Sequence, residues 1–162
     1  MAISLPVLAL TWPLAAALAL SAPVPPVIPL RLVAPFESPR TDWGAGHRGI
    51  DLAADTDQPV ASLTQGVIGF AGMIAGKPVV TVHMGDGRRV TYEPVLTGLA
   101  PGRPVRAGEL IGVVASRGGH CGGEAGCLHI GLLDGSGYVD PLALLRRPAV
   151  LRPLQPRPGL PR

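Results

Sequence analysis

Two short motifs carry side chains that can bind a metal ion. The stretch GHRGIDLAA, residues 46–54, places His47 and Asp51 four residues apart, and CLHIGLL, residues 127–133, places His129 inside an apolar run. Two imidazoles and one carboxylate would give zinc three ligands and leave its fourth position open. Taken singly, His129 also fits a core histidine and Asp51 a turn cap, so the motifs raise the question of whether the fold brings them together.

The composition fits one modest domain with few helices. The chain has 162 residues, of which 22 are Gly and 19 are Pro, so long helices are excluded from most of it. The formal net charge of +3 comes from the arginines after Leu145, in a segment without acids. We expect residues 148–162 to be a disordered Arg/Pro-rich tail, and no nucleic-acid partner, because no basic face with interleaved aromatics accompanies these arginines.

The N-terminus has the character of an export signal. Residues 3–22 carry no charged side chain, Pro6 and Pro13 interrupt the apolar run, and small residues close it near Ala19 and Ala22. We predict a signal peptide over residues 1–22, although no Lys or Arg precedes the apolar run. An uncleaved membrane anchor is the alternative, and both interpretations export the protein. Residues 23–31, which include PVPPVIP, are predicted to be a Pro-rich linker.

Short valine- and isoleucine-rich runs separated by glycine turns dominate the rest of the chain. They predict strands over 30–35, 60–63, 66–71, 78–84, 88–95, 109–115 and 128–133. Gly85-Asp86-Gly87 predicts a tight hairpin, and only 141–147 reads as a short helix. The spacing favours an all-β protein, an antiparallel β-sandwich or barrel-like domain over residues 32–147, which we expect to be monomeric.

Cys121 and Cys127 are the only cysteines. In an exported protein we expect them to form a disulfide. A zinc-binding pair is the alternative, but the separation is wide for a zinc knuckle and no second cysteine pair exists.

The stretch VRAGELI, residues 105–111, raises the alternative of a carrier domain, because biotinyl and lipoyl domains share this turn. Lys77, the only lysine, lacks the flanking residues of such a carrier site.

The ordered set of motifs resembles the lysostaphin-type (LytM-like) zinc metallopeptidases, secreted enzymes that cut the peptide bridges of peptidoglycan. The set comprises GHRGIDLAA, PVASLTQGVIGFAG, VVTVHMGDGRRVTYEPV, VRAGELIG, CLHIGLL and YVDPLALL, and the match covers residues 32–145. The resemblance implies an antiparallel β-sandwich with the site in a groove, and one Zn²⁺ held by His47, Asp51 and His129. It assigns no catalytic role to His83.

Two family histidines that assist catalysis are absent. Cys127 stands at the first position of the family's H-x-H motif, and Pro94 stands at the histidine of its Y-x-H-L motif. Glu93 and His120 are candidate replacements, because glutamate is the general base in other zinc peptidases and the expected disulfide would hold His120 near the His129 strand. Simple strand alternation argues against Glu93, since it places Glu93 and Pro94 on opposite faces unless a bulge intervenes.

Three functions remain open from the sequence. The first is an exported, cell-wall-associated zinc endopeptidase that hydrolyses peptidoglycan peptides. The second is a catalytically impaired, zinc-bearing module that binds the cell wall or regulates another cell-wall hydrolase; degenerate family members of this kind generally lose the zinc ligands, which this chain keeps. The third is a disulfide-stapled structural domain without metal.

Overall fold

The structure, a computed structural model, describes residues 23–145 apart from residues 42, 117–120 and 122–125. The predicted signal peptide and Arg/Pro-rich tail, and His120, lie outside the described residues. The strands are β1 (Leu32–Ala34), β2 (Ile50–Ala53), β3 (Pro59–Ala61), β4 (Gly66–Ile74), β5 (Lys77–His83), β6 (Arg89–Glu93), β7 (Val95–Leu96), β8 (Pro104–Val105), β9 (Leu110–Val114), β10 (Cys127–Asp134) and β11 (Gly137–Val139), and they are followed by the short 3-10 helix η1 (Pro141–Leu144).

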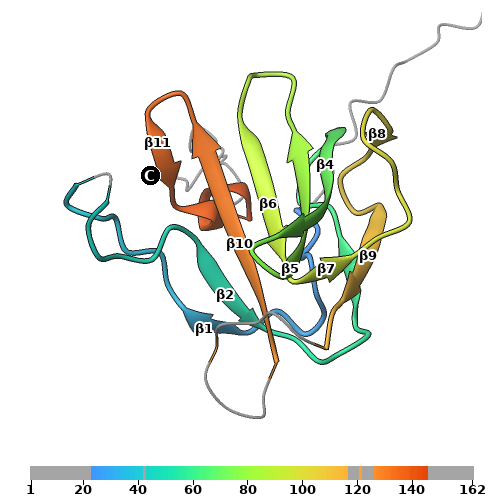
Figure 1. The fold of residues 1–162 in the computed structure, drawn as a ribbon, viewed down its shortest axis with the longest axis horizontal. Helices are drawn as coiled ribbons and strands as arrows, with labels where there is room; N and C mark the ends of the chain where they lie inside the picture. The colour runs from blue at the N-terminus through green and yellow to red at the C-terminus, as the bar shows by residue number, and fades with distance from the viewer. Residues whose placement is uncertain (1–22, 42, 117–120, 122–125, 146–162) are drawn as a thin grey trace, which may run out of the picture.

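The described strands form two antiparallel sheets. The larger sheet has the order β1-β2-β10-β6-β5-β4-β8, with β11 paired to β10, and the smaller sheet has the order β3-β9-β7. Figure 1 shows β10 and β6 side by side in the middle of the larger sheet. The predicted all-β antiparallel fold is therefore confirmed.

The core lies between the two sheets because apolar side chains alternate along the strands. In β6, Val90 and Tyr92 are buried while Arg89, Thr91 and Glu93 are partly exposed on the other face. One continuous apolar cluster joins residues of both sheets; it includes Ile50, Leu52, Val80, Val82, Leu128, Ile130 and Leu132 from the larger sheet and Val60, Val95, Ile111 and Val114 from the smaller. The opposite face of the larger sheet is thus left for polar side chains.

The turns follow the local sequence. Gly87, at the end of the predicted Gly85-Asp86-Gly87 hairpin between β5 and β6, has a φ of 87°, a conformation that glycine adopts without strain. Asp140 caps η1, because the Leu142 N–H donates to its carboxylate at 2.9 Å. The short strands β2, β8 and β11 were not expected; β2 contains Asp51, and its pairing with β10 proves to position the site.

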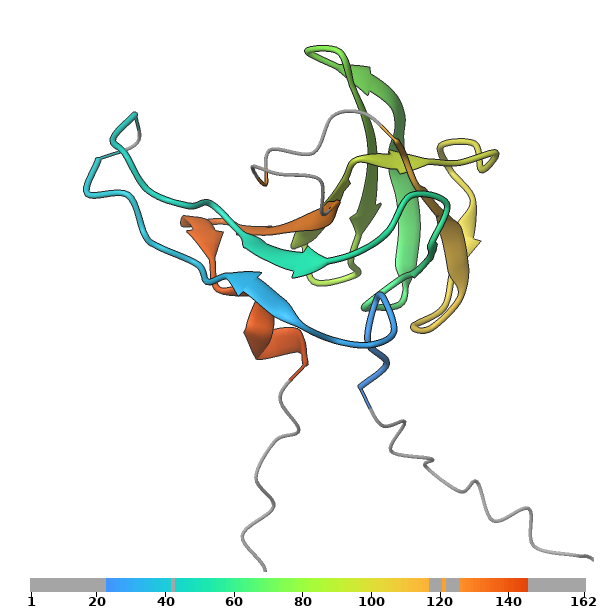
Figure 2. The same cartoon turned by 90° about the horizontal axis from the view of Figure 1, so that it is seen from below.

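The segment 23–31, expected to be a linker, contributes to the core. Val27 is 1% exposed, and the Ala61 N–H of β3 donates to the Pro26 carbonyl at 2.8 Å. The segment contains four prolines, and its backbone hydrogen-bonds to an edge of the smaller sheet while Val27 fills the core. Figure 2 shows the loop between β1 and β2 extending away from the two sheets. None of the helices in the described residues is long and apolar enough to span a membrane.

Tyr92 anchors the core with a buried hydroxyl. Its ring is 0% exposed, and the Leu63 N–H donates to its hydroxyl oxygen at 2.9 Å. Burial raises the pKa of Tyr92 from 10.0 to about 12, because the phenolate would lose its hydration. The side chain therefore stays neutral and joins the larger sheet to the loop after β3.

We expect Tyr92→Phe to lower the free energy of unfolding by about 1–3 kcal/mol, because it leaves the buried Leu63 N–H without an acceptor. The folded-state pKa of Tyr92 is raised, so its contribution is complete below pH 10 and is lost as the pH rises from 10 towards 12. Urea titrations followed by circular dichroism at pH 8 and 11 check this. A gap between wild type and variant that does not narrow at pH 11 would contradict the account.

Candidate metal centre

His47 reaches the site from the long loop between β1 and β2. Its backbone is fixed by an isolated bridge to Glu37, in which Glu37 N donates to His47 O at 3.0 Å and His47 N donates to Glu37 O at 2.8 Å. Gly46 permits this approach, because a Cβ there would lie 2.7 Å from the Glu37 carbonyl oxygen. Gly46 therefore helps to position His47.

The imidazole of His47 is held in one tautomer. Its Nδ1 lies 2.6 Å from the Pro35 carbonyl oxygen, which can only accept a hydrogen bond, so Nδ1 carries the proton. In a neutral ring the lone pair is then on Nε2, the atom that points at Asp51 and His129. A metal-binding histidine generally donates its other ring N–H to a carbonyl or carboxylate, as His47 Nδ1 does here.

Asp51 and His129 are placed by strand pairing. They are direct partners in the antiparallel β2–β10 ladder, so their side chains lie on the same face of the larger sheet. Their neighbours Leu52 and Leu128, which are also partners, point into the core and are 1% and 0% exposed. The apolar core thus fixes the register that brings the carboxylate beside the second imidazole.

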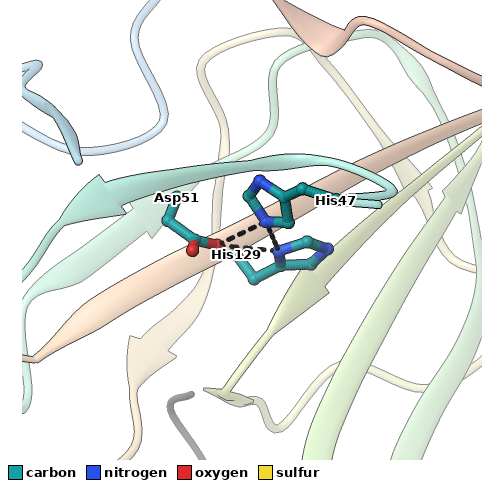
Figure 3. Close-up of side chains that lie close together, drawn as sticks. All are labelled: His47, Asp51 and His129. Atoms are coloured by element: carbon teal, nitrogen blue, oxygen red, sulfur yellow. Dashed lines mark hydrogen bonds and ion pairs between the residues drawn. The ribbon is translucent and has the colours of Figure 1, made fainter. Parts of the chain in front are cut away.

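The three side chains converge on one point (Figure 3). His47 Nε2 lies 3.2 Å from Asp51 Oδ1 and 3.2 Å from His129 Nδ1, and His129 Nδ1 lies 2.8 Å from Asp51 Oδ1. Asp51 is 4% exposed, so its carboxylate lies where an unpaired charge would be costly. The three residues form a group able to hold one metal ion.

The donor set fits zinc. Ligand atoms arranged tetrahedrally at about 2.0–2.1 Å from zinc lie about 3.3 Å from one another, close to the separations between the three donors. Two nitrogens and one carboxylate oxygen are one of the ligand sets found in catalytic zinc sites, which leave one position for water or substrate. His47, Asp51 and His129, the residues that the sequence resemblance implied, are therefore the residues that would hold the ion.

Gly49 explains the glycine between the two ligands of the first motif. A Cβ at this position would lie 2.3 Å from the Ile130 carbonyl oxygen and 2.6 Å from Cε1 of the His129 ring. Only glycine lets the chain cross β10 this closely. The spacing of His47 and Asp51 and the position of His129 thus depend on one missing side chain.

A disulfide lies beside the ligands. The structure contains the expected Cys121–Cys127 bond. Cys127 precedes His129 by two residues in β10, so both side chains lie on the same face. The sulfur atoms of both cysteines lie within 4.8 Å of a carboxylate oxygen of Asp51. The disulfide therefore stands where the family's first H-x-H histidine would be, and its sulfurs, being oxidised, are not thiolate ligands.

Glu93 lies on the ligand face. It is the β6 partner of His129, so Asp51, His129 and Glu93 form one row across β2, β10 and β6. The alternation argument against Glu93 was misleading, because β6 ends at Glu93 and the chain then passes to β7 of the smaller sheet. Lys77 Nζ donates to Glu93 Oε1 at 2.7 Å, an ion pair that sequence reasoning missed because its partners lie on different strands.

The remaining histidines are separate from this cluster or outside the described residues. His83 lies at the end of β5, and its ring packs over Gly69, where an added Cβ would meet its Nε2 at 2.4 Å. His120 is not among the described residues.

The fold and the cluster point to a class: an antiparallel β domain that carries a His-Asp-His group able to hold a metal ion on one sheet face resembles a metallopeptidase domain. The family model of peptidase family M23 matches residues 45–141, and the chain belongs to this family. An uncharacterized protein of Mycobacterium tuberculosis, Rv2891, is 42% identical over 132 residues, which cover 78% of this chain and 52% of the relative. The chain thus spans about half the length of the curated relatives it matches.

Several solved structures share this fold. Helicobacter pylori Csd3 is 30% identical, with a TM-score of 0.63 over 76% of this chain and 34% of that one. The catalytic domain of the antimicrobial peptidase lysostaphin from Staphylococcus simulans has a TM-score of 0.59 at 24% identity, over 72% and 92% of the chains. A zinc-containing peptidase from Vibrio cholerae has a TM-score of 0.61 at 18% identity, over 78% and 40%. The likeness to a lysostaphin-type protein is confirmed.

We expect Gly49→Ala to weaken zinc binding about 10–100-fold, because the new methyl group displaces the His129 ring. Competition with a fluorescent zinc chelator measures the affinity. Gly85→Ala is the matched control, since a Cβ at Gly85 meets nothing within 4 Å and should leave the affinity unchanged. Equal zinc affinities for Gly49→Ala and wild type would contradict the described site.

Proposed function

We propose that this protein is an exported zinc metalloendopeptidase that hydrolyses peptide bridges of peptidoglycan. The observation that carries the proposal is the row of Asp51, His129 and Glu93, joined by His47, on one face of the sheet. Membership of peptidase family M23 supports the reaction type, and the likeness to lysostaphin, an antimicrobial peptidase, supports a cell-wall substrate.

The residues that would hold the ion are His47, Asp51 and His129. The surroundings of His47 and Asp51 favour this role. The Pro35 carbonyl keeps the His47 proton on Nδ1, and the low exposure of Asp51 keeps competing water away from its carboxylate. Zinc bound there supplies a Lewis acid that polarises the scissile carbonyl and lowers the pKa of nearby water.

Glu93 is the residue we assign as general base. Partners in an antiparallel ladder have Cα atoms about 4.5–5.5 Å apart, so its carboxylate is within reach of a water positioned at the His129 side of the cluster. It would accept a proton as the water oxygen attacks the peptide carbon, and pass it to the amine that leaves when the C–N bond breaks. Lys77 would position Glu93 through their 2.7 Å ion pair.

His120 is a second candidate for proton transfer or for stabilising the oxyanion. The Cys121–Cys127 disulfide ties its sequence neighbour to the start of β10, two residues before His129. A role for His120 would return an imidazole to the part of the site where the family's first H-x-H histidine is replaced by Cys127.

A zinc-bearing module that binds cell-wall peptides, or regulates another hydrolase, is the alternative function. Pro94 and Cys127 replace the two family histidines that assist catalysis, and general acid–base groups are typically worth about 10²–10⁴ in rate. The alternative keeps the zinc and the peptide binding but has no hydrolysis. We propose export through residues 1–22 for either function, since peptidoglycan lies outside the cytoplasm.

The first test measures zinc and hydrolysis together. Purified wild-type protein should contain one zinc per chain by mass spectrometry and should release peptide fragments from purified cell walls. His129→Ala should lose both properties, while His83→Ala, whose ring packs against β4, should keep its zinc. Stoichiometric zinc without hydrolysis above the His129→Ala background would establish the non-enzymatic alternative, and wild-type protein without zinc would overturn both functions.

The second test concerns the general base. We expect Glu93→Gln to lower kcat about 10²–10⁴-fold while zinc content stays the same, because glutamine keeps the shape but accepts no proton. Glu109→Gln is the matched control: it removes a carboxylate paired with Arg103 at 2.9 Å, in the turn before β9 of the smaller sheet, and should leave kcat unchanged. Full activity in Glu93→Gln would remove Glu93 from the mechanism and point to His120→Ala as the next variant.

A further inference from the structure

The ligand face of the larger sheet continues beyond the metal row. Two residues along β6 and β10, a second row holds Gly131, Thr91 and Thr81, and two residues further a third row holds Leu133, Arg89 and His83. All of these residues share a face with His129 because the ladders between β10, β6 and β5 run without a register shift.

Two polar atoms on this face are buried without a hydrogen-bond partner: Thr81 Oγ1 and Arg89 Nε. Thr81 is 6% exposed, and Arg89 is partly buried. They are diagonal neighbours on adjacent strands, since Thr81 is opposite Thr91 and Arg89 is two residues from Thr91. Both atoms are shielded from solvent in the free protein, so a ligand reaches them only when a neighbouring side chain shifts. A buried polar atom without a partner typically costs about 1–3 kcal/mol, and a ligand that bonds to both atoms would recover this cost.

Nearby acids are committed elsewhere. Asp86 Oδ2 accepts from Arg88 at 2.7 Å, and Asp134 Oδ1 accepts from the Ser136 hydroxyl at 2.6 Å. Within the described residues, no hydrogen bond or ion pair satisfies the Arg89 Nε. The His83 ring leans over Gly69 in β4, which leaves Arg89 as the free cation of the third row.

We propose that Arg89 and Thr81 form a subsite for a carboxylate of the peptide substrate. The inference rests on the proposed function for its substrate class. A guanidinium presents two parallel N–H donors that match a carboxylate, and a threonine hydroxyl donates a further hydrogen bond. Acidic peptides are therefore favoured over neutral ones such as oligoglycine.

The geometry also places the carboxylate along the substrate. Arg89 is four residues from Glu93 in β6, about 13 Å at 3.3 Å per residue. The row between Glu93 and Arg89 carries only Gly131, Thr91 and Thr81, so short side chains, including the subsite's own threonine, lie between the metal row and Arg89. An extended peptide spans this distance in about four residues, which places the recognised carboxylate about four residues from the bond that is cut.

The test measures binding separately from hydrolysis. Fluorescein-labelled peptidoglycan stem peptides are prepared in pairs that differ only in one free carboxylate or its carboxamide. Fluorescence anisotropy with the zinc-loaded full chain, recorded at low temperature before measurable cleavage, gives the two affinities. We expect wild type to prefer the carboxylate at least tenfold, Arg89→Gln to lose this preference, and Arg88→Gln, a neighbouring arginine paired with Asp86, to keep it.

Thr81→Val separates a binding role from a structural one. Valine keeps the shape and removes the unpaired hydroxyl, so the variant should melt at the same temperature or higher while its carboxylate preference falls a few-fold. Equal binding of both peptides by wild type, or equal losses for both peptides in Arg89→Gln, would overturn the subsite. A carboxylate preference in a protein that cuts no peptide would support the subsite and refute the hydrolase.

Discussion

The site depends on the position of β10 between β2 and β6. Antiparallel pairing on both sides places His129 opposite Asp51 on one edge and opposite Glu93 on the other. The register is held by the core, because a slip of one residue would turn Leu128, Ile130 and Leu132 out of the apolar cluster and His129 into it. The free energy of burying apolar side chains on one face therefore sets the geometry of the polar residues on the other.

The two substitutions of family histidines have different structural consequences. Cys127 replaces an imidazole by half of a disulfide that packs beside Asp51, which makes that side of the site apolar and covalently tied to Cys121. Pro94 comes directly after Glu93, where the chain leaves the larger sheet, so Glu93 is the last side chain of β6 on the ligand face. In the row of Asp51, His129 and Glu93, the Glu93 carboxylate is thus the member nearest β5, and it is paired with Lys77 of that strand.

Much of this arrangement could be predicted from the sequence, and the rest depended on long-range pairing. Short valine- and isoleucine-rich runs predicted β4, β5, β6, β9 and β10, and the family resemblance predicted that His47, Asp51 and His129 lie together. The short strand β2 was missed because four residues carry little periodic signal. The face of Glu93, its ion pair with Lys77 and the unpaired atoms of Arg89 and Thr81 depend on strand register, which local sequence does not specify.

The central claim is that one ion is held by His47, Asp51 and His129 with Glu93 directed at its open position. A crystal structure of the zinc-loaded protein, with anomalous scattering at the zinc edge, tests it most directly. The account predicts a single zinc bound to His47 Nε2, Asp51 Oδ1 and His129 Nδ1, with a water that hydrogen-bonds to the Glu93 carboxylate. Zinc at other residues, or a Glu93 side chain directed away from that water, would contradict it.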